Sequence, residues 1–475
     1  HTPVPKWITN LESAPISSLE VSRGGKRIAT IARDPTSNLF LYETPQATER
    51  WPIAENHLRA ALNILATGIR PGPAFNDPPE RTSRPDDVTL DITADSKHTI
   101  TLSANALGGA ISATLDSQSS GATLSPNGDF LKVFNPAAIA AWRSPLAFPA
   151  DSMTGGGGAG EPAMLRMDAL GQTLDLRKRG ANWSLTPLNA NADNAKVRAL
   201  FEKLLHLAAQ RIIGPSPSDA ATKAWTDVPT LHAVIDSFFR TASADGRVQR
   251  RQLRQELRIG GAADASAATL LAQAAAYWID PETNQQSLAW GPMLLTLPAP
   301  EIKALSLDPL GYLSRNATQL PAADITKIYL GEAPALDVFL ADKPPTPPPP
   351  DLLAKHSGPW SRIVLARTID GWQTATQLGV NHPLPQARAN QLLNAIRNAE
   401  AASVTVIPAA GATPIATIIT AGARGTQDVL LIGEAAEAGD PPLLIIRNGS
   451  IFYTFRAETA KAVIELLKEL VPTEG

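Results

Sequence analysis

WSLTPLNANADNAKVRALFEKLLHLAAQ, the stretch from Trp183 to Gln210, decides the fold that the sequence predicts. The Asn and Asp residues at 191–193 are typical of a helix N-cap, because their side-chain oxygens accept hydrogen bonds from the first free backbone N–H groups. After them, apolar residues recur at the spacing of a helix with one buried face: Val197, Leu200, Phe201, Leu204, Leu205 and Ala208. The stretch therefore predicts an amphipathic helix that follows a tryptophan.

The same order of features occurs twice more in the chain. Trp51 begins WPIAENHLRAALNILATG, and Trp372 begins WQTATQLGVNHPLPQARANQLLNAIRNAE. Each stretch has a tryptophan, a spacer with polar residues or proline, and a helix with an apolar stripe. Because a repeated supersecondary unit determines architecture, we interpret Trp51, Trp183 and Trp372 as structural residues at one place in a repeat, packed between helix and sheet.

The length of 475 residues agrees with about three units, at roughly 150 residues per domain. We expect repeat unit one at 1–150, a Gly-rich linker at 151–160, unit two at 161–320 with a helical insertion, and unit three at 321–475 with a polyproline insertion at 343–350. Alternating apolar runs between Gly, Asn and Pro turns predict strands in every unit. The expected class is α+β, with three tandem units that each pack a small, mostly antiparallel sheet against one or two helices.

Four stretches carry more specific expectations. Residues 227–240 (DVPTLHAVIDSFFR) place apolar residues at helical spacing, and the alanine-rich stretch of about 262–276 also favours a helix. Residues 335–341 (ALDVFLA) favour a strand, as does the preceding ITKIYL.

Composition argues against several classes of function. Lys and Arg number 42 against 45 Asp and Glu, and the near-neutral balance of 42 − 45 = −3 argues against nucleic-acid binding. The absence of cysteine excludes disulfides, thiolate metal sites and a cysteine nucleophile, and it suits an oxidising compartment. No run of 18 or more apolar residues occurs, so we expect no spanning segment here. His1 in place of an initiator Met indicates a chain that is processed, tagged or cut from a longer one, and this leaves room for a lost signal or anchor.

Motifs for chemistry are missing from the sequence. The seven histidines form no H-x-H or H-E-x-x-H spacing, and we expect His57, His206 and His232 to be packing residues on helices. The run Gly155–Gly158 lacks the Lys and the helix start of a phosphate loop, and no Ser lies in a nucleophile elbow. We therefore predict no catalytic residue, no metal and no cofactor.

One basic run stands out as a docking candidate: Arg247, Arg250, Arg251, Arg254 and Arg258. As a strand it would turn alternate arginines to water, whereas as a helix four of them would form one stripe. Its ordinary interpretation is a solvated face, and its functional one is docking to an acidic partner or to lipid headgroups.

Laid side by side, units two and three resemble a bacterial family, the domain-of-unknown-function 4340 proteins. The matching pieces are ITKIYL, Asn182-Trp183-Ser184-Leu185-Thr186-Pro187 and Asp370-Gly371-Trp372, the helix VRALFEKLLHL, and SIFYTFR before AETAKAVIELL. Leu257-Arg258-Ile259-Gly260 and Leu430-Leu431-Ile432-Gly433 match the family's L-x-I-G strand end. In unit one no clear L-x-I-G occurs.

The resemblance implies an extracytoplasmic, periplasmic protein that is held at the inner membrane by an N-terminal helix absent from this chain. It also implies partners among membrane proteins, namely the permease and auxiliary subunit of gliding-type ABC transporters. We therefore expect a non-enzymatic accessory or scaffold subunit of a membrane assembly that is associated with an ABC transporter or with motility. The alternatives are an envelope polysaccharide or peptide binding module, which exposed Trp278, Trp290 or Trp360 would favour, a self-assembling structural protein or homo-oligomer, and a hydrolase.

Overall fold

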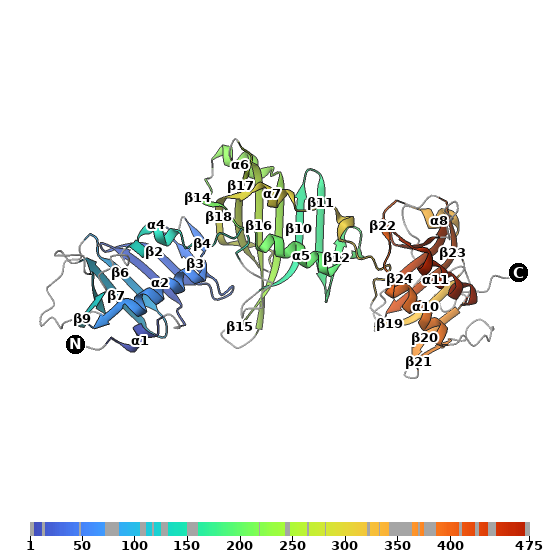
Figure 1. Ribbon diagram of the computed structural model, residues 1–475, viewed down its shortest axis with the longest axis horizontal. Helices are drawn as coiled ribbons and strands as arrows, with labels where there is room; N and C mark the ends of the chain where they lie inside the picture. Colours follow the sequence, from blue (N-terminus) through green and yellow to red (C-terminus); the bar gives the residue numbers. More distant parts are fainter. Residues whose placement is uncertain are drawn as a thin grey trace. The chain divides into compact units, whose positions relative to one another are not determined.

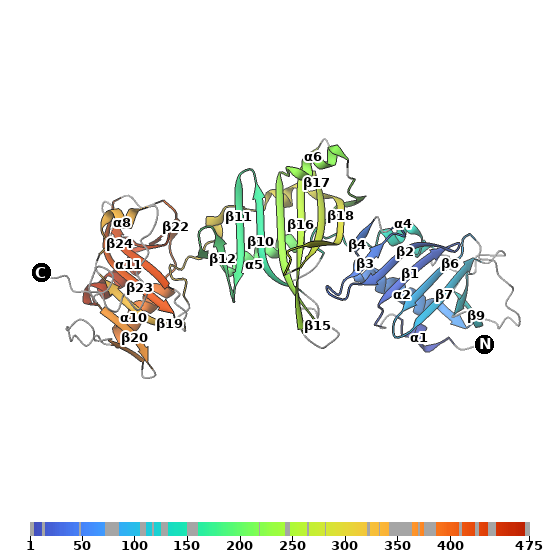
Figure 2. The ribbon, with the colours of Figure 1, turned by 180° about the vertical axis from the view of Figure 1, so that it is seen from behind.

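The computed structural model contains three antiparallel sheets, each packed with helices (Figures 1 and 2). The expected α+β class is therefore confirmed. The structure describes residues 4–11, 15–46, 49–71, 85–104, 111–115, 118–124, 132–149, 160–217, 219–242, 248–263, 266–280, 282–320, 324–331, 333–341, 363–368, 371–374, 386–407, 411–422, 427–435 and 443–470.

Sheet one is formed by the first nine strands, in the spatial order β4-β3-β2-β1-β6-β7-β8-β9-β5. The strands are β1 (Ser18–Arg23), β2 (Lys26–Arg33), β3 (Phe40–Glu43), β4 (Arg50–Pro52), β5 (Ile69–Pro71), β6 (Val88–Thr93), β7 (Lys97–Ala104), β8 (Ile111–Leu115) and β9 (Gln118–Leu124). Helices α1 (Lys6–Thr9), α2 (Glu55–Gly68) and α4 (Pro136–Ala140) accompany it. Leu58, Leu62 and Leu65 of α2 are buried, as the apolar spacing predicts.

Sheet two has nine strands in the order β13-β12-β11-β10-β15-β16-β17-β18-β14. They are β10 (Glu161–Ala169), β11 (Gln172–Arg179), β12 (Asn182–Thr186), β13 (Ala190–Asn191), β14 (Arg211–Pro215), β15 (Leu231–Ala242), β16 (Val248–Ala262), β17 (Thr269–Ile279) and β18 (Gln286–Pro298). The helical segments are α5 (Asn194–Leu205), α6 (Ala220–Asp227), α7 (Ala299–Lys303) and the 3-10 turn η1 (Pro309–Tyr312). At the start of α5, Asp193 Oδ1 accepts hydrogen bonds from the N–H groups of Ala195 and Lys196, which is the cap that the sequence predicts.

Sheet three has the order β21-β20-β19-β23-β24-β25-β26-β22. Its strands are β19 (Ile325–Gly331), β20 (Ile363–Thr368), β21 (Gly371–Thr374), β22 (Ser403–Thr405), β23 (Ala412–Gly422), β24 (Gln427–Ala435), β25 (Leu443–Asn448) and β26 (Ile451–Phe455). Its helices are α8 (Leu336–Leu340), α10 (Gln386–Asn398) and α11 (Ala457–Leu470), and α10 packs against α11.

The three sheets share one strand order. In sheets one and two the strands that correspond in chain order occupy the same nine positions. The strand that follows α2 or α5, which is β5 or β14, lies at the sheet edge beside β9 or β18. Sheet three follows the same path, but the position that β4 and β13 occupy is not filled among its described strands. The chain is therefore an internal repeat at the level of topology.

The segments that follow two of these sheets are bonded alike. Ser144 N–H donates to the carbonyl of Pro52 and Ala209 N–H to that of Pro145, while Ala54 N–H donates to that of Trp142. The segment after sheet two has the matching bonds: the N–H groups of Ser314, Ala401 and Asp193 donate to the carbonyls of Asn191, Arg315 and Tyr312, respectively. We call the segments 142–148 and 312–318 the connectors. Each connector forms backbone hydrogen bonds with two other segments of the chain.

By internal contacts the chain divides into two compact units, His1–Thr173 with Ala199–Leu307, and Leu174–Arg198 with Asp308–Gly475. The three predicted units at 1–150, 161–320 and 321–475 remain predictions. The linker at 151–160, apart from Gly160, and the polyproline insertion at 343–350 lie outside the described residues.

Three of the predicted elements are wrong. The helix expected at 227–240 is strand β15, where both alternating sets of side chains are largely buried, so that the apolar residues fit either period. The alanine-rich helix expected at 262–276 is largely strand β17, which pairs with β16 on one side and β18 on the other, so that sheet pairing overrides the helix propensity of alanine. The strand expected at 335–341 is the short helix α8, whose Phe339 packs into the core of sheet three.

Candidate docking face of the second sheet

Sheet two presents a polar face opposite its helix-covered face. In Figure 1 helix α5 lies across the strands, and in the reverse view of Figure 2 the strands lie in front of it. Along β16 the buried residues Leu253, Leu257 and Ile259 alternate with partly exposed polar ones, as the two-residue period of a strand requires. The charged partners of these polar residues come from the neighbouring strand β15.

An ion pair between Asp236 and Arg254 lies at the centre of this face. The two residues are directly opposite each other in β15 and β16, and Arg254 donates from Nε and Nη2 to the two carboxylate oxygens at 2.9 Å each. Gln252 adds a third hydrogen bond of 2.9 Å to the same carboxylate, whose residue is only 4% exposed. The hydrogen bond from Arg254 to Asp236 raises the pKa of Arg254, so this guanidinium stays charged.

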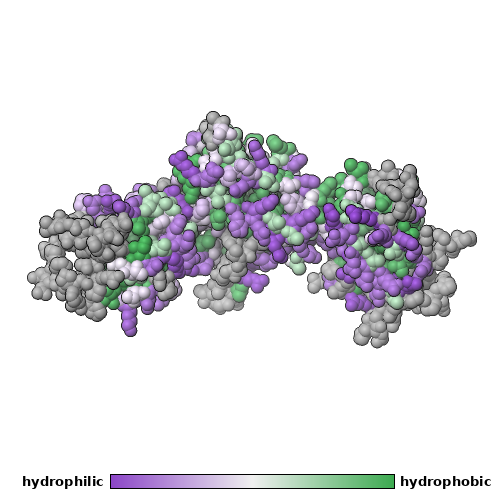
Figure 3. Space-filling model, viewed as in Figure 1, coloured by the Kyte–Doolittle hydropathy of each residue, from purple (hydrophilic) through white to green (hydrophobic). Residues whose placement is uncertain are grey.

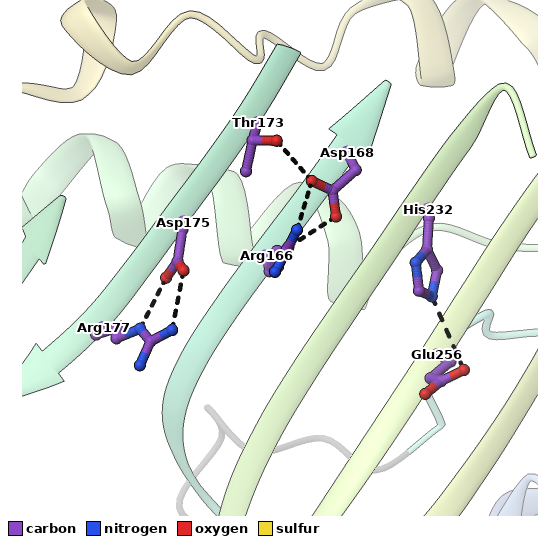
Figure 4. Close-up of polar contacts among 7 residues, drawn as sticks. All are labelled: Arg166, Asp168, Thr173, Asp175, Arg177, His232 and Glu256. Atoms are coloured by element: carbon purple, nitrogen blue, oxygen red, sulfur yellow. Dashed lines mark hydrogen bonds and ion pairs between the residues drawn. The ribbon is translucent and has the colours of Figure 1, made fainter. Parts of the chain in front are cut away.

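A second charged group surrounds Glu256. His232 Nε2 lies 3.8 Å from its carboxylate (Figure 4). Arg258 Nη2 lies 3.2 Å from the same carboxylate. The pKa of Glu256 is lowered, first by its contact with His232 and then by the charges of Arg258, His232 and Arg254, against the effect of burial. Arg258 Nη1 also lies 3.4 Å from the carbonyl of Thr226 near the end of α6, so one side chain contacts both the sheet and the helix.

A third group lies on β10 and the start of β11. Arg166 donates to both carboxylate oxygens of Asp168, at 2.8 and 3.2 Å, and Thr173 donates at 2.6 Å (Figure 4). Burial alone would raise the pKa of Asp168, but these hydrogen bonds and the charges of Arg166 and His232 outweigh it and leave the pKa lowered. Figure 4 also shows Asp175 with Arg177, which repeats the pairing of residues two apart on one side of a strand.

A hollow of about 350 Å³ adjoins this third group. The turn from Asp168 to Thr173 lines it on one side, with Asp227, Val228, Pro229 and His232 on the other. Leu170 is 94% exposed and Val228 is 78% exposed beside it. Both carboxylate oxygens of Asp168 are already occupied, so the hollow offers an open depression rather than a preformed ligand cage.

The structure places the docking candidates in different surroundings. Arg254 and Arg258 are in the ion pairs described above. Arg251 donates to Thr36 Oγ1 at 2.9 Å and lies 4.8 Å over the Trp278 ring, whereas Arg250 lies 3.6 Å over the Phe238 ring. Arg247 lies outside the described residues. The described part of the run, Arg250 to Arg258, lies on strand β16, and its arginines therefore point to both faces.

Among the tryptophans, Trp183 and Trp372 lie on β12 and β21, which hold the same place in the strand order. Trp51 lies one strand further on, in β4, where it is fully buried and donates to the carbonyl of Ser144 at 2.9 Å. Trp278 and Trp290 are buried as well, and Trp360 lies outside the described residues. In the part of the chain that the structure describes, no group of three or more metal-binding side chains occurs.

Sequence reasoning missed the acidic half of this face. Asp236 and Glu256 are separated by twenty residues, and the predicted helix at 227–240 hid their strand pairing. The signal that could have found them is alternation, since Asp236 lies two residues from Val234 and Phe238 on one face of a strand.

The comparisons with known proteins give no relative: no family model, no curated protein and no solved structure matches the chain. No helix in the described ranges combines the length and apolar character needed to cross a membrane.

Proposed function

We propose that this chain is a non-enzymatic scaffold, an accessory subunit of a membrane assembly outside the cytoplasm. The observation that carries the proposal is the shared strand order of the three sheets, together with the two connectors that are hydrogen bonded in the same way. Repeated units that each bury a core of their own and are joined by hydrogen-bonded connectors offer a large surface for binding partners rather than a catalytic cleft.

The surface supports this proposal. Hydrophilic side chains are spread over the described surface with smaller apolar areas among them, as Figure 3 shows in one view. On the polar face of sheet two, arginines alternate with Asp236 and Glu256, an arrangement that can recognise a charged partner without chemistry.

The identity of the assembly comes from the resemblance described above. We propose that the assembly is a gliding-type ABC transporter, that the partners are its permease and auxiliary subunit, and that the location is the periplasm, with an anchor to the inner membrane. The alternative of an envelope-binding module gains no support from Trp278 and Trp290, because both rings are buried.

Mild crosslinking in native membranes tests the proposal, with the chain as bait and mass spectrometry of the captured proteins. We expect the permease or the auxiliary subunit to be recovered above a control with heat-unfolded bait. If the bait recovered only copies of itself, self-assembly would replace the scaffold, and recovery of envelope glycan alone would favour the binding module. Turnover of a substrate by the purified chain would overturn the non-enzymatic assignment.

A further inference from the structure

The hairpin of β15 and β16 extends beyond the strands on either side of it. Residues Phe239–Ala242 pair with Val248–Arg251 at four successive positions, ending in Ala242 opposite Val248. On one side β10 pairs only as far as Phe238, and on the other β17 pairs only as far as Gln252. Figures 1 and 2 show the β15 end projecting past its neighbours. We call residues 239–242 and 248–251 the arm.

One face of the arm packs within its own unit. The Phe239 ring meets the Trp278 ring edge to face at 5.6 Å, and Arg251 lies over the same indole while it bonds Thr36. Gly160 lies so close to Phe239 that an added Cβ would be 2.5 Å from the ring. These contacts hold the base of the arm in place.

The other face carries unbalanced positive charge. Arg240 and Arg250 are directly opposite each other, both exposed, and like charges in this position repel. Among the described residues neither guanidinium has an acidic partner, and Arg250 instead lies 3.6 Å over the Phe238 ring. Between Phe238 and Gln252 the sequence has four arginines and one aspartate, so the charge is not balanced along the chain either.

The edges of the arm pair with no strand among the described residues. Beyond Glu161 no described strand lies beside β15, and beyond Ile279 none lies beside β16, so backbone N–H and C=O groups there face no strand of the described chain. Such an edge is a template for an added strand, with backbone hydrogen bonds for affinity and alternate side chains for specificity.

We propose that the arm binds an extended acidic peptide segment of a partner protein, which adds as a strand to one of its edges and places carboxylates on Arg240 and Arg250. A phosphate-bearing polymer could use the two guanidinium groups, but it has no strand backbone to pair with the edge, and this favours the peptide. The inference names the partner chemistry of the scaffold and so rests on the proposed function.

A fluorescence titration of the purified chain at low ionic strength tests the inference, with a blocked, labelled peptide of alternating glutamate and valine as the probe. We expect binding that the alternating lysine and valine peptide does not show. The variant R240S/R250S should raise the dissociation constant about tenfold, since each exposed arginine loses one charge-assisted contact. K26S/R27S removes the same charge from another exposed hairpin, β1–β2, and should leave the dissociation constant unchanged.

Two further probes separate strand addition from charge alone. A glutamate and valine peptide that is N-methylated at alternate residues keeps its charge but cannot pair with an edge, so it should bind weakly. The charge-reversed R240E/R250E should lose the acidic peptide and bind the lysine one, with circular dichroism to confirm folding. Equal binding of the N-methylated peptide, tighter binding of a single-stranded oligonucleotide, or unchanged binding by R240S/R250S would each overturn the inference.

This titration uses the chain by itself, so its result is separable from the membrane experiment. Peptide binding without recovery of a transporter would keep the arm as an acidic-peptide site and remove the transporter assignment. Recovery of a transporter that R240S/R250S leaves unchanged would keep the scaffold and remove the arm as its contact.

Discussion

Gly260 of β16 lies directly beneath the indole ring of Trp225 from α6. A Cβ added at Gly260 would lie 2.8 Å from the ring, which is closer than a Cβ contact allows. Gly433, at the corresponding strand position in β24, lies in the same way beneath Phe339 of α8, again at 2.8 Å. The final glycine of both L-x-I-G stretches therefore has a physical role, because it lets an aromatic ring of a short helix rest on the sheet.

Replacing Gly260 by alanine tests this role. We expect G260A to lower the free energy of unfolding by about 1–3 kcal/mol, because the Trp225 ring must move away from the strand. The neighbouring G261A is the control, since nothing lies within 4 Å of its added Cβ, and it should change stability by less than about 0.5 kcal/mol. Urea unfolding followed by tryptophan fluorescence measures both. Equal stability of the two variants would contradict the packing.

The repeat could be predicted from the sequence because its helices have local signals. The N-cap at Asp193 and the stripe that contains Val197 and Leu204 specify α5 without help from distant residues. Strand β17 could not be predicted, since alanine favours a helix and only pairing with β16 and β18, which lie elsewhere in the sequence, makes this stretch a strand. The same holds for β15, whose length is set by pairing with β16.

Of the polar face of sheet two, the sequence predicted the arginines but not their acidic partners. The basic run was visible as a string of arginines, and its alternation allowed a strand or a helix equally. Which arginine meets Asp236 and which is left for a partner depends on the register of β15 with β16. Register is a tertiary property, because one residue of slip exchanges the two faces.

Removing Arg254 should leave Asp236 buried with a single neutral donor, Gln252. We expect R254M to destabilise the chain by about 2–4 kcal/mol, because removal of one partner of a largely buried ion pair leaves the other charge buried without it. R250M removes an exposed arginine from the same strand and should cost less than about 1 kcal/mol. Urea unfolding of the two variants gives the comparison, and the double variant R254M/D236L should recover part of the loss. A cost for R254M no larger than that for R250M would contradict the ion pair.

Stability should depend on pH through Glu256. Its pKa is lowered in the folded chain, so its contribution is complete above the unfolded value of about 4.3 and is lost as pH falls through the folded pKa. The groups that act on it are His232, Arg258 and Arg254. We expect E256Q to be less stable than the parent chain by about 1 kcal/mol near neutral pH and to differ little well below pH 4. Denaturant unfolding of both chains across this range measures the difference, and a gap that widened toward low pH would contradict the sign.

Arg447 provides the strongest single test of sheet three. It is 1% exposed, its Nε donates to the Gly449 carbonyl at 2.9 Å, and its remaining nitrogens donate to the carbonyls of Val338, Phe339 and Ala341 at the end of α8. The last carbonyls of a helix have no partner within the helix, and a guanidinium supplies donors for them.

We therefore expect R447M to cost about 2–4 kcal/mol, because it leaves several buried carbonyls without a donor. R447K should recover little, since an ammonium cannot reproduce the planar fork of the guanidinium. R388M is the control, because Arg388 is exposed on α10 and its pair with Glu469 at 3.3 Å is at the surface, so the cost should stay below about 1 kcal/mol. Protection of the α8 amides from hydrogen exchange should fall in R447M and not in R388M. If R447K matched the parent chain in both measurements, the charge alone and not the set of carbonyl contacts would be what holds α8 to the sheet.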